Sequence, residues 1–240
     1  MRYPTGHKIS ESVYQSIRFV AKVGVMTRPT WYELFGTGSI RWKQKQLQHL
    51  LELGLFKPHP CAHVQNVMTI GEFGKKLIQE KNWIHSPSVS AQFIEHDETV
   101  ARGVWRLEQG SICQKWYTDK ELKQLKEGHF KLNTKDISSK FPDIVMRIKG
   151  NEKQETVAVE YEKTCKSNWR YNKAIMAYSD SSDFDRVLYI VETKAIEESV
   201  KRAMRFIGDS YVNRRIGFIQ ASDWKNDPVI AMGGLMQKTA

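Results

Sequence analysis

The 240-residue chain has few cysteines and no long apolar segment. Its three cysteines, Cys61, Cys113 and Cys165, are scattered and odd in number, which argues against a framework of disulfides and favours a reducing compartment. No apolar run approaches the ~18 residues that a membrane-spanning helix requires. Residues 1–10 also lack the apolar core of a signal peptide. We therefore expect a cytoplasmic protein without a membrane span.

Acidic residues are scarce relative to basic ones. The chain has 27 Asp and Glu against 37 Lys and Arg, which gives a formal net charge of +10. The excess is uneven, because residues 1–90 carry 12 basic and 5 acidic side chains (+7), whereas residues 91–240 carry 25 and 22 (+3). A strongly basic protein favours a polyanionic partner. The asymmetry suggests a basic binding module joined to a second, nearly balanced module.

The chain also lacks internal repeats and low-complexity tracts, and its 40% apolar content is sufficient for ordinary folded cores. Residues 86–90, SPSVS, are small and polar, as is typical of a boundary between domains. We therefore expect one domain over residues 1–85 and another over residues 91–240.

Apolar spacing and capping residues predict three helices, two short strands and a further helix in the first domain. Thr27 and Ser39 are suited to begin helices, and Gly36 and Gly54 to end them. This order is typical of a winged helix-turn-helix, whose third helix enters the major groove of DNA. The predicted helices and strands cover residues 10–23, 27–36, 39–53, 55–57, 64–69 and 71–82.

The third predicted helix carries the candidate DNA contacts. Basic and amide side chains crowd its first turns, where they would reach phosphates and base edges. The alternative is an ordinary solvated helix in a structural or protein-binding winged domain. The candidate DNA-binding residues here are Arg41, Trp42, Lys43, Lys45 and Gln46.

Two alternating segments, residues 144–148 and 157–162, predict a β-hairpin with its turn at residues 150–153. A hairpin centred between residues 151 and 152 sets Asp143 opposite Glu160, with their Cβ atoms about 5 Å apart. Glu162 lies on the same side. Three convergent carboxylates repel one another unless a cation lies between them, so this pattern predicts a Mg²⁺ or Mn²⁺ site. The alternative is a solvated edge with scattered acids.

A helix predicted over residues 91–109 contributes further acidic candidates. It begins with His96, Asp97 and Glu98, which would join the acidic site if the helix leans on the sheet. The alternative is that acidic residues lie there because the helix dipole favours them near an N-terminus.

The elements after the hairpin complete an α/β fold. Lys163 falls on the face opposite Glu160, whereas Lys166 begins the next helix and its side chain could return toward the carboxylates. A mixed sheet flanked by helices is expected from these alternating strands and helices. They are predicted at residues 111–118, 166–178, 185–192, 194–207 and 215–220. Residues 222–240 carry no readable chemistry and suggest either a tail or an edge strand over residues 229–232.

At Pro142-Asp143, Glu160-Tyr161-Glu162 and Lys166, the sequence resembles the PD-(D/E)XK restriction-endonuclease-like superfamily. The resemblance implies a restriction-endonuclease-like mixed sheet. One departure is that Glu162 stands where the superfamily pattern has Lys, so Lys166 would be a relocated lysine.

A narrower resemblance covers most of the chain: it is similar to plasmid mobilisation relaxases of the MobC type and to replication-relaxation proteins. The resemblance implies metal-dependent nicking of one DNA strand at a plasmid transfer origin, with mobilisation proteins or a coupling protein as further partners. The implied active-site candidates are His96, Asp97, Glu98, Asp143, Glu160, Glu162 and Lys166. The carboxylates Asp143, Glu160, Glu162 and Asp97 form the candidate metal set for Mg²⁺ or Mn²⁺.

The attacking group is left open between water and a tyrosine hydroxyl. Tyr171, one helical turn beyond the hairpin, is the candidate tyrosine, and Lys166 would orient a water or stabilise the transition-state charge. Arg170 would contact a phosphate, and Trp169 would either stack on an unpaired base or pack structurally. Two other functions remain open, a non-enzymatic DNA-binding protein and a double-strand endonuclease.

Overall fold

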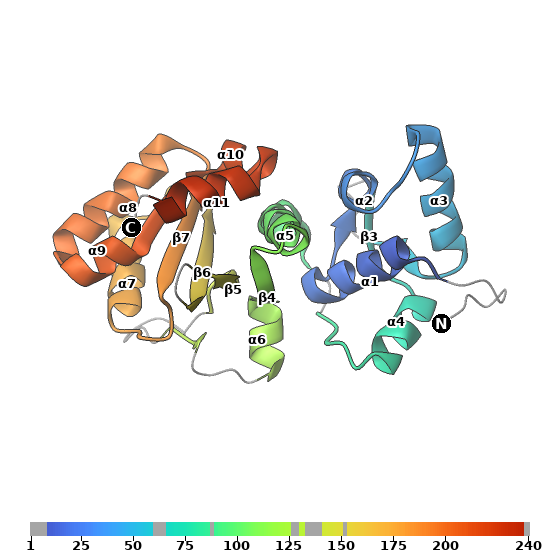
Figure 1. The fold of residues 1–240 in the computed structure, drawn as a ribbon, viewed down its shortest axis with the longest axis horizontal. Helices are drawn as coiled ribbons and strands as arrows, with labels where there is room; N and C mark the ends of the chain where they lie inside the picture. Colours follow the sequence, from blue (N-terminus) through green and yellow to red (C-terminus); the bar gives the residue numbers. More distant parts are fainter. Residues whose placement is uncertain are drawn as a thin grey trace. The chain divides into compact units, whose positions relative to one another are not determined.

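The computed structural model describes residues 9–59, 66–86, 89–125, 130–132, 141–150 and 153–237. The chain divides into two compact units, Met1–Glu98 and Thr99–Ala240, so the division falls inside one helix rather than at residues 86–90. Figure 1 shows the elements of each unit.

In its described residues, the first unit combines several helices with a small antiparallel sheet. Strand β3 lies in the centre of the sheet, pairing Met26 with Met68 on one side and Phe56 with Ile70 on the other. The two-residue strand β1 was not expected from the sequence, because two residues are too few to show an alternating pattern. The elements are α1 (Glu11–Val23), β1 (Met26–Thr27), α2 (Arg28–Leu34), α3 (Ile40–Glu52), β2 (Phe56–Pro58), β3 (Val67–Ile70) and α4 (Glu72–Glu80).

Capping residues set the ends of these helices as the sequence predicts. The Thr27 hydroxyl accepts a hydrogen bond from the Thr30 N–H (3.3 Å), and the Ser39 hydroxyl accepts one from the Trp42 N–H (3.4 Å). Gly54 has a left-handed φ of 70° just past α3, a conformation that glycine adopts without steric cost. Leu47 and Leu50 are buried on the inner face of α3, so its other face is left for solvent or a ligand.

The second unit is built on a five-stranded mixed sheet with the strand order β4-β5-β6-β7-β8. Strands β4, β5 and β6 are antiparallel neighbours, and β6, β7 and β8 are parallel neighbours, which confirms the predicted α/β mixed sheet. The strands are β4 (Cys113–Thr118), β5 (Ile144–Lys149), β6 (Gln154–Glu162), β7 (Arg186–Val191) and β8 (Ile216–Gln220).

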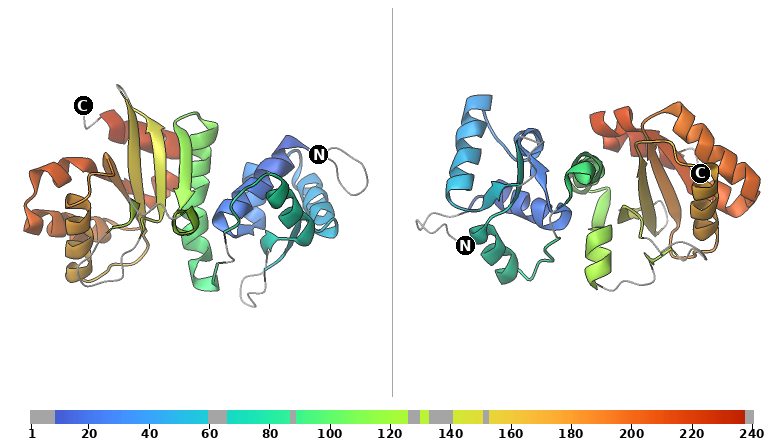
Figure 2. Two further views of the ribbon diagram at one scale, coloured as in Figure 1. Left: turned by 90° about the horizontal axis from the view of Figure 1, so that it is seen from below. Right: turned by 180° about the vertical axis from the view of Figure 1, so that it is seen from behind.

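Helices cover both faces of this sheet, as the views in Figure 2 show. Val145, Ala158 and Tyr189 pack on one face in a buried cluster with side chains of α7 and α8. On the opposite face α10 contacts β7 and β8. The helical segments are η1 (Ala91–Phe93), α5 (Ile94–Gln109), α6 (Asp119–Leu125), α7 (Asn168–Ser179), α8 (Lys194–Ile207), α9 (Ser210–Arg215), α10 (Ala221–Asn226) and α11 (Pro228–Gln237).

The suggested edge strand at residues 229–232 is wrong, because this segment lies inside α11. The Asp227 carboxylate accepts hydrogen bonds from the N–H groups of Val229 (2.9 Å) and Ile230 (3.1 Å), and Pro228 suits the first helical position. Asp227 and Pro228 therefore favour the start of a helix over a strand. No helix in the part of the chain that the structure describes is long and apolar enough to cross a membrane.

Candidate functional site

The β5–β6 hairpin has the register expected from the sequence. Ile144 pairs with Val159, and the pairing continues to Lys149 and Gln154. Asp143 lies one residue before the first pair, which places it level with Glu160. Its carboxylate Oδ2 accepts a hydrogen bond from the Tyr161 N–H at 2.8 Å. At the end of the β5–β6 ladder, the Asp143 carboxylate therefore accepts a hydrogen bond that a backbone carbonyl would otherwise accept.

Glu160 and Glu162 lie on the face of the sheet that α7 covers, not on a solvated edge. Alternation along β6 places Glu160 and Glu162 on the same side as Ala158, which belongs to the cluster packed with α7 and α8. Only 2% of Glu160 and 4% of Glu162 is exposed. Burying carboxylates is costly unless they gain hydrogen bonds or an opposite charge, so their partners define the site.

The two buried carboxylates contact different donors. The Tyr178 hydroxyl donates to Glu160 Oε1 at 2.7 Å, and Lys166 Nζ lies 2.7 Å from Glu162 Oε1. Among the residues that the structure describes, no three His, Cys, Asp or Glu side chains come together as a metal-binding group. The expected three-carboxylate convergence is thus absent there; like charges repel, and these carboxylates turn to separate donors instead.

Lys166 returns toward the carboxylates from the segment between β6 and α7, as its position predicts. Its ammonium group forms the ion pair with Glu162 while 35% of its side chain stays exposed. The cation therefore lies where a buried carboxylate meets solvent. Hydrogen bonds from Lys225 and Tyr161 lower the pKa of Glu192, which follows β7. The charge of Lys163 makes a smaller contribution to the same lowering.

Tyr171 is buried on the inner side of α7. Its hydroxyl accepts a hydrogen bond from the Lys166 N–H at 3.1 Å, and only 1% of the residue is exposed. Burial raises the pKa of Tyr171 to about 12, and the nearby Glu162 carboxylate adds to the rise. The hydroxyl is therefore neutral at physiological pH and fixes the segment that carries Lys166.

Two tyrosines that the sequence did not single out complete this cluster. Tyr189 stands directly across from Glu160 on β7, and its buried hydroxyl has no hydrogen-bond partner among the described residues. Burial raises the pKa of both Tyr178 and Tyr189 well above the usual value, and the Glu160 carboxylate raises both further. No sequence signal marks them, because both occupy apolar-patterned core positions. We call Asp143, Glu160, Glu162, Lys166, Tyr171, Tyr178 and Tyr189 the hairpin cluster.

The donor chemistry of the hairpin cluster fits a hard divalent cation. Its carboxylate and hydroxyl oxygens are the ligand type that Mg²⁺ and Mn²⁺ prefer. The unsatisfied Tyr189 hydroxyl also leaves hydrogen-bonding capacity beside Glu160, which a buried polar group normally uses.

The acidic start of α5 belongs to the first unit. The Glu98 carboxylate Oε1 accepts a hydrogen bond from the Thr27 N–H at 2.6 Å, where α2 begins, and Glu98 is 6% exposed. His96 Nδ1 lies 3.0 Å from Asp97 Oδ1. These three candidates fall in unit Met1–Glu98, whereas the hairpin cluster lies in unit Thr99–Ala240.

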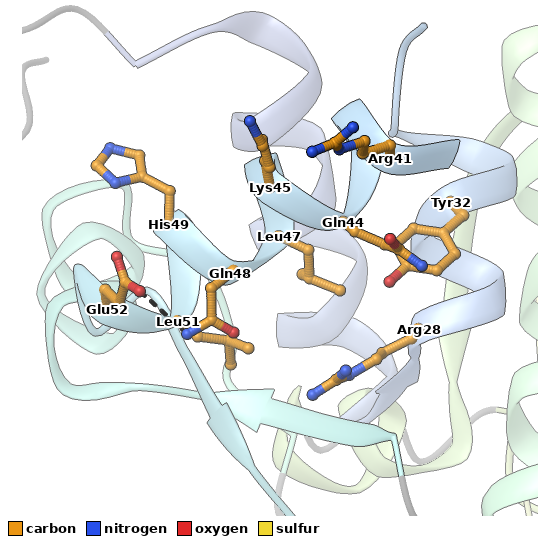
Figure 3. Close-up of a pocket in the computed structure, with 10 residues that line it drawn as sticks. All are labelled: Arg28, Tyr32, Arg41, Gln44, Lys45, Leu47, Gln48, His49, Leu51 and Glu52. Atoms are coloured by element: carbon orange, nitrogen blue, oxygen red, sulfur yellow. Dashed lines mark hydrogen bonds between the residues drawn. The ribbon is translucent and has the colours of Figure 1, made fainter. Parts of the chain in front are cut away.

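Helix α3 presents a polar face beside a groove of about 580 Å³. Arg41, Gln44, Lys45 and Gln48 follow one another at helical spacing along this groove, and all four are exposed. Figure 3 shows Arg41, Lys45 and His49 projecting from the same side of the helix. Arginine and glutamine are the side chains that form paired hydrogen bonds with guanine and adenine edges.

The predicted DNA contacts on α3 divide into two groups. Arg41, Trp42 and Lys45 are exposed. In contrast, Lys43 Nζ donates to the Tyr32 carbonyl at 2.6 Å near the end of α2, and Gln46 donates to the Thr37 hydroxyl at 3.5 Å. Gln44 and Gln48 were not among the predicted contacts, although their spacing from Arg41 places them on its face.

Arg28, at the start of α2, also lines the groove. Its Nε is buried and has no hydrogen-bond partner among the described residues. An unsatisfied guanidinium nitrogen beside an open polar groove is suited to an anionic ligand.

Comparisons with known proteins identify no family for this chain. No family model matches, and no curated protein matches. A solved structure of the restriction endonuclease FokI bound to DNA is 9% identical, with a TM-score of 0.32 and 93% of this chain covered. A second structure of the restriction endonuclease FokI is 8% identical, with a TM-score of 0.35 and 95% covered. The chain spans less than half of those chains, 44% and 46%. With TM-scores this low, neither neighbour carries an inference about this chain.

Proposed function

We propose that this protein is a DNA-binding, metal-dependent endonuclease that nicks one strand of a duplex. The observation that carries the proposal is the hairpin cluster, in which Asp143 lies level with buried Glu160, and buried Glu162 is ion-paired with Lys166 at 2.7 Å. Buried carboxylates with a cation at the solvent boundary are typical of sites that act on charged substrates.

In this proposal, Asp143 and Glu160 would hold Mg²⁺ or Mn²⁺, and Glu162 would hold Lys166 through their ion pair. The ion, when bound, polarises a phosphate and lowers the pKa of water. Tyr178 positions the Glu160 carboxylate by donating a hydrogen bond at 2.7 Å. Tyr189 would donate its unsatisfied hydroxyl to an oxygen that enters the cluster.

Lys166 would stabilise the negative charge that develops on the phosphate during cleavage. Glu162 and the Tyr171 hydroxyl hold its side chain and backbone, respectively. We assign the attack to water rather than Tyr171, because this residue is 1% exposed and burial raises its pKa to about 12. His96, Asp97 and Glu98 have no part in the cleavage that we propose.

The first unit would bind the duplex as a winged helix. Apart from the added strand β1, its order of helices and strands is the predicted one, and α3 is the helix that such a domain places in the major groove. Arg41, Gln44, Lys45 and Gln48 would contact base edges and phosphates, with Trp42 beside them. Lys43 and Gln46 would hold α3 in place through their contacts with Tyr32 and Thr37.

The finer part of the proposal is a site-specific relaxase at a plasmid transfer origin. It comes from the sequence resemblance to mobilisation relaxases, together with the basic first unit and the acidic hairpin in one chain. Mobilisation proteins or a coupling protein would then be its partners in the cytoplasm.

A second candidate is a DNA-binding protein without nuclease activity. Each hairpin carboxylate has a protein partner, and the described residues contain no group of three metal-ligating side chains. A hairpin stabilised by such contacts would need no metal. This candidate predicts DNA binding that EDTA leaves unchanged and no cleavage.

The test is incubation of the full-length protein with its supercoiled parent plasmid in the presence of Mn²⁺ or EDTA. We expect open circles with Mn²⁺ only, and at least about a hundredfold less nicking by Asp143→Asn and Glu160→Gln, since each removes a carboxylate that would hold the metal. Linear product would indicate a double-strand endonuclease. Unchanged supercoiled DNA would favour the non-enzymatic candidate.

Glu192→Gln is the matched control. This carboxylate at the end of β7 accepts hydrogen bonds from Tyr161 and from Lys225 (2.7 Å) on the other face of the sheet. We expect it to nick DNA like the wild type. Nicking retained in both Asp143→Asn and Glu160→Gln would contradict the site assignment.

A further inference from the structure

Trp169 is a large aromatic side chain near the start of α7 that is not used in the core. It is 55% exposed, although tryptophan normally contributes strongly to packing. Lys173, one helical turn further on, places its Nζ 4.1 Å from the centroid of the Trp169 ring. This cation–π contact orders the indole at the surface.

The segment around Trp169 is strongly cationic. Residues 163–179 contain four basic side chains, Lys163, Lys166, Arg170 and Lys173, and no Asp or Glu. Arg170 is exposed beside Trp169. The combination of an ordered aromatic surface and a basic segment complements a polyanion that also carries aromatic rings.

This segment continues directly from the hairpin cluster. Lys166, three residues before Trp169, forms the ion pair with Glu162 at 2.7 Å. Tyr171, two residues after it, is buried and accepts the Lys166 N–H. Contacts on both sides of Trp169 therefore fix its backbone next to the carboxylates.

We propose that Trp169, with Arg170 and Lys173, is a stacking platform for an unpaired nucleobase of the DNA strand. The base would stack on the indole, and the flanking phosphates would contact Arg170 and Lys173. The inference rests on the proposed endonuclease and deepens it, because it names the substrate as a locally unpaired strand. An indole can stack only on a base that has an uncovered face. In an intact duplex, neighbouring bases cover both faces of each base.

The experiment uses full-length protein and a short single-stranded oligonucleotide that carries the fluorescent base 2-aminopurine. Stacking on Trp169 quenches this base, and we expect Trp169→Ala to abolish the quenching and weaken single-strand binding roughly 5- to 100-fold. Trp169→Phe keeps an aromatic face and should stay within about threefold of the wild type. Binding of the same sequence as a duplex should be unchanged in both variants, because α3 carries it.

Phe206→Ala is the matched control, since it removes a 76% exposed aromatic side chain from α8 in the same unit. It should leave both the affinity and the quenching at wild-type values. Equal thermal melting of all three variants would show that the folded population is unchanged.

The platform and the endonuclease can fail separately. If Trp169→Ala binds and quenches like the wild type, or if the wild type binds no single strand, the platform is overturned whether or not plasmid is nicked. If Trp169→Phe loses as much as Trp169→Ala, stacking is likewise overturned. If binding depends on Trp169 but no plasmid is nicked, the platform stands and the endonuclease is wrong.

Discussion

Three buried tyrosines surround the carboxylates of the hairpin cluster, and their hydroxyl groups determine its local electrostatics. Burial raises the pKa of Tyr171 to about 12 and raises those of Tyr178 and Tyr189 well above the usual value. All three hydroxyls therefore stay protonated at physiological pH. A neutral hydroxyl can donate to a carboxylate without adding negative charge, as the Tyr178 hydroxyl does to Glu160.

The raised tyrosine pKa values predict a loss of stability in alkali. Between pH 10 and about 12 the unfolded chain loses the Tyr171 proton while the folded protein keeps it, so the free energy of unfolding falls as the pH rises. Below pH 10 this contribution is fully present. Urea unfolding at pH 8, 10 and 11 should show a shallower alkaline decline for Tyr171→Phe than for the wild type.

The same variant should nick plasmid with at least about a third of the wild-type activity, if water is the attacking group as we propose. Tyr171→Phe should also lower the free energy of unfolding by about 1 kcal/mol at pH 8, because the Lys166 N–H loses its hydrogen-bond acceptor. A DNA–protein adduct that survives detergent and disappears in Tyr171→Phe would contradict our choice of nucleophile.

At the scale of elements, α5 contacts α10 in the second unit through a glycine. The Trp224 indole N–H donates to the Thr99 carbonyl at 3.2 Å, and Trp224 is fully buried. A Cβ atom at Gly103 would lie 2.1 Å from Trp224 Cε2, far inside contact distance. The absence of a side chain at Gly103 therefore allows α10, which also contacts β7 and β8, to pack close to α5.

We expect Gly103→Ala to destabilise the protein by more than about 2 kcal/mol, because the buried indole must move to accommodate the methyl group. Thermal or urea unfolding measures the change. The matched control is Gly233→Ala in α11, where an added Cβ has no atom within 4 Å among the described residues. Alanine there should be neutral or stabilising by up to ~1 kcal/mol. Equal effects of the two substitutions would contradict this packing.

At the scale of the whole molecule, the excess positive charge is concentrated in residues 1–90. Residues 1–90 hold +7 of the net +10, and Arg41 and Lys45 are exposed along the groove of α3. Duplex binding through phosphates would therefore depend mainly on the segment that carries α3 and would weaken steeply with salt.

We expect Arg41→Ala and Lys45→Ala each to weaken duplex binding and to reduce the slope of log K against log[salt] by about 0.9 for each phosphate that the variant no longer neutralises. Fluorescence anisotropy at several salt concentrations measures both quantities. Lys76→Ala, which removes an exposed charge from α4 in the same unit, is the matched control and should keep the wild-type slope. An unchanged slope in Arg41→Ala and Lys45→Ala would argue against α3 as the duplex-binding helix.

The sequence by itself determined most of the elements and the register of the acidic hairpin. Alternation with period two in β5 and β6, together with a turn near residues 150–153, was enough to set Asp143 level with Glu160, because a one-residue slip would have turned every buried side chain outward. Thr27 and Ser39 likewise fixed helix starts through local hydrogen bonds. These features depend on neighbours in sequence, so the pattern alone predicts them.

Only the tertiary structure decided what each acidic side chain contacts. It paired Glu160 with Tyr178 and Glu98 with the Thr27 N–H, and it buried Tyr171 and Tyr189 beside the carboxylates. It also buried Trp224 against α5. These outcomes follow from long-range packing, which selects among donors that have no fixed spacing from their acceptors in the sequence.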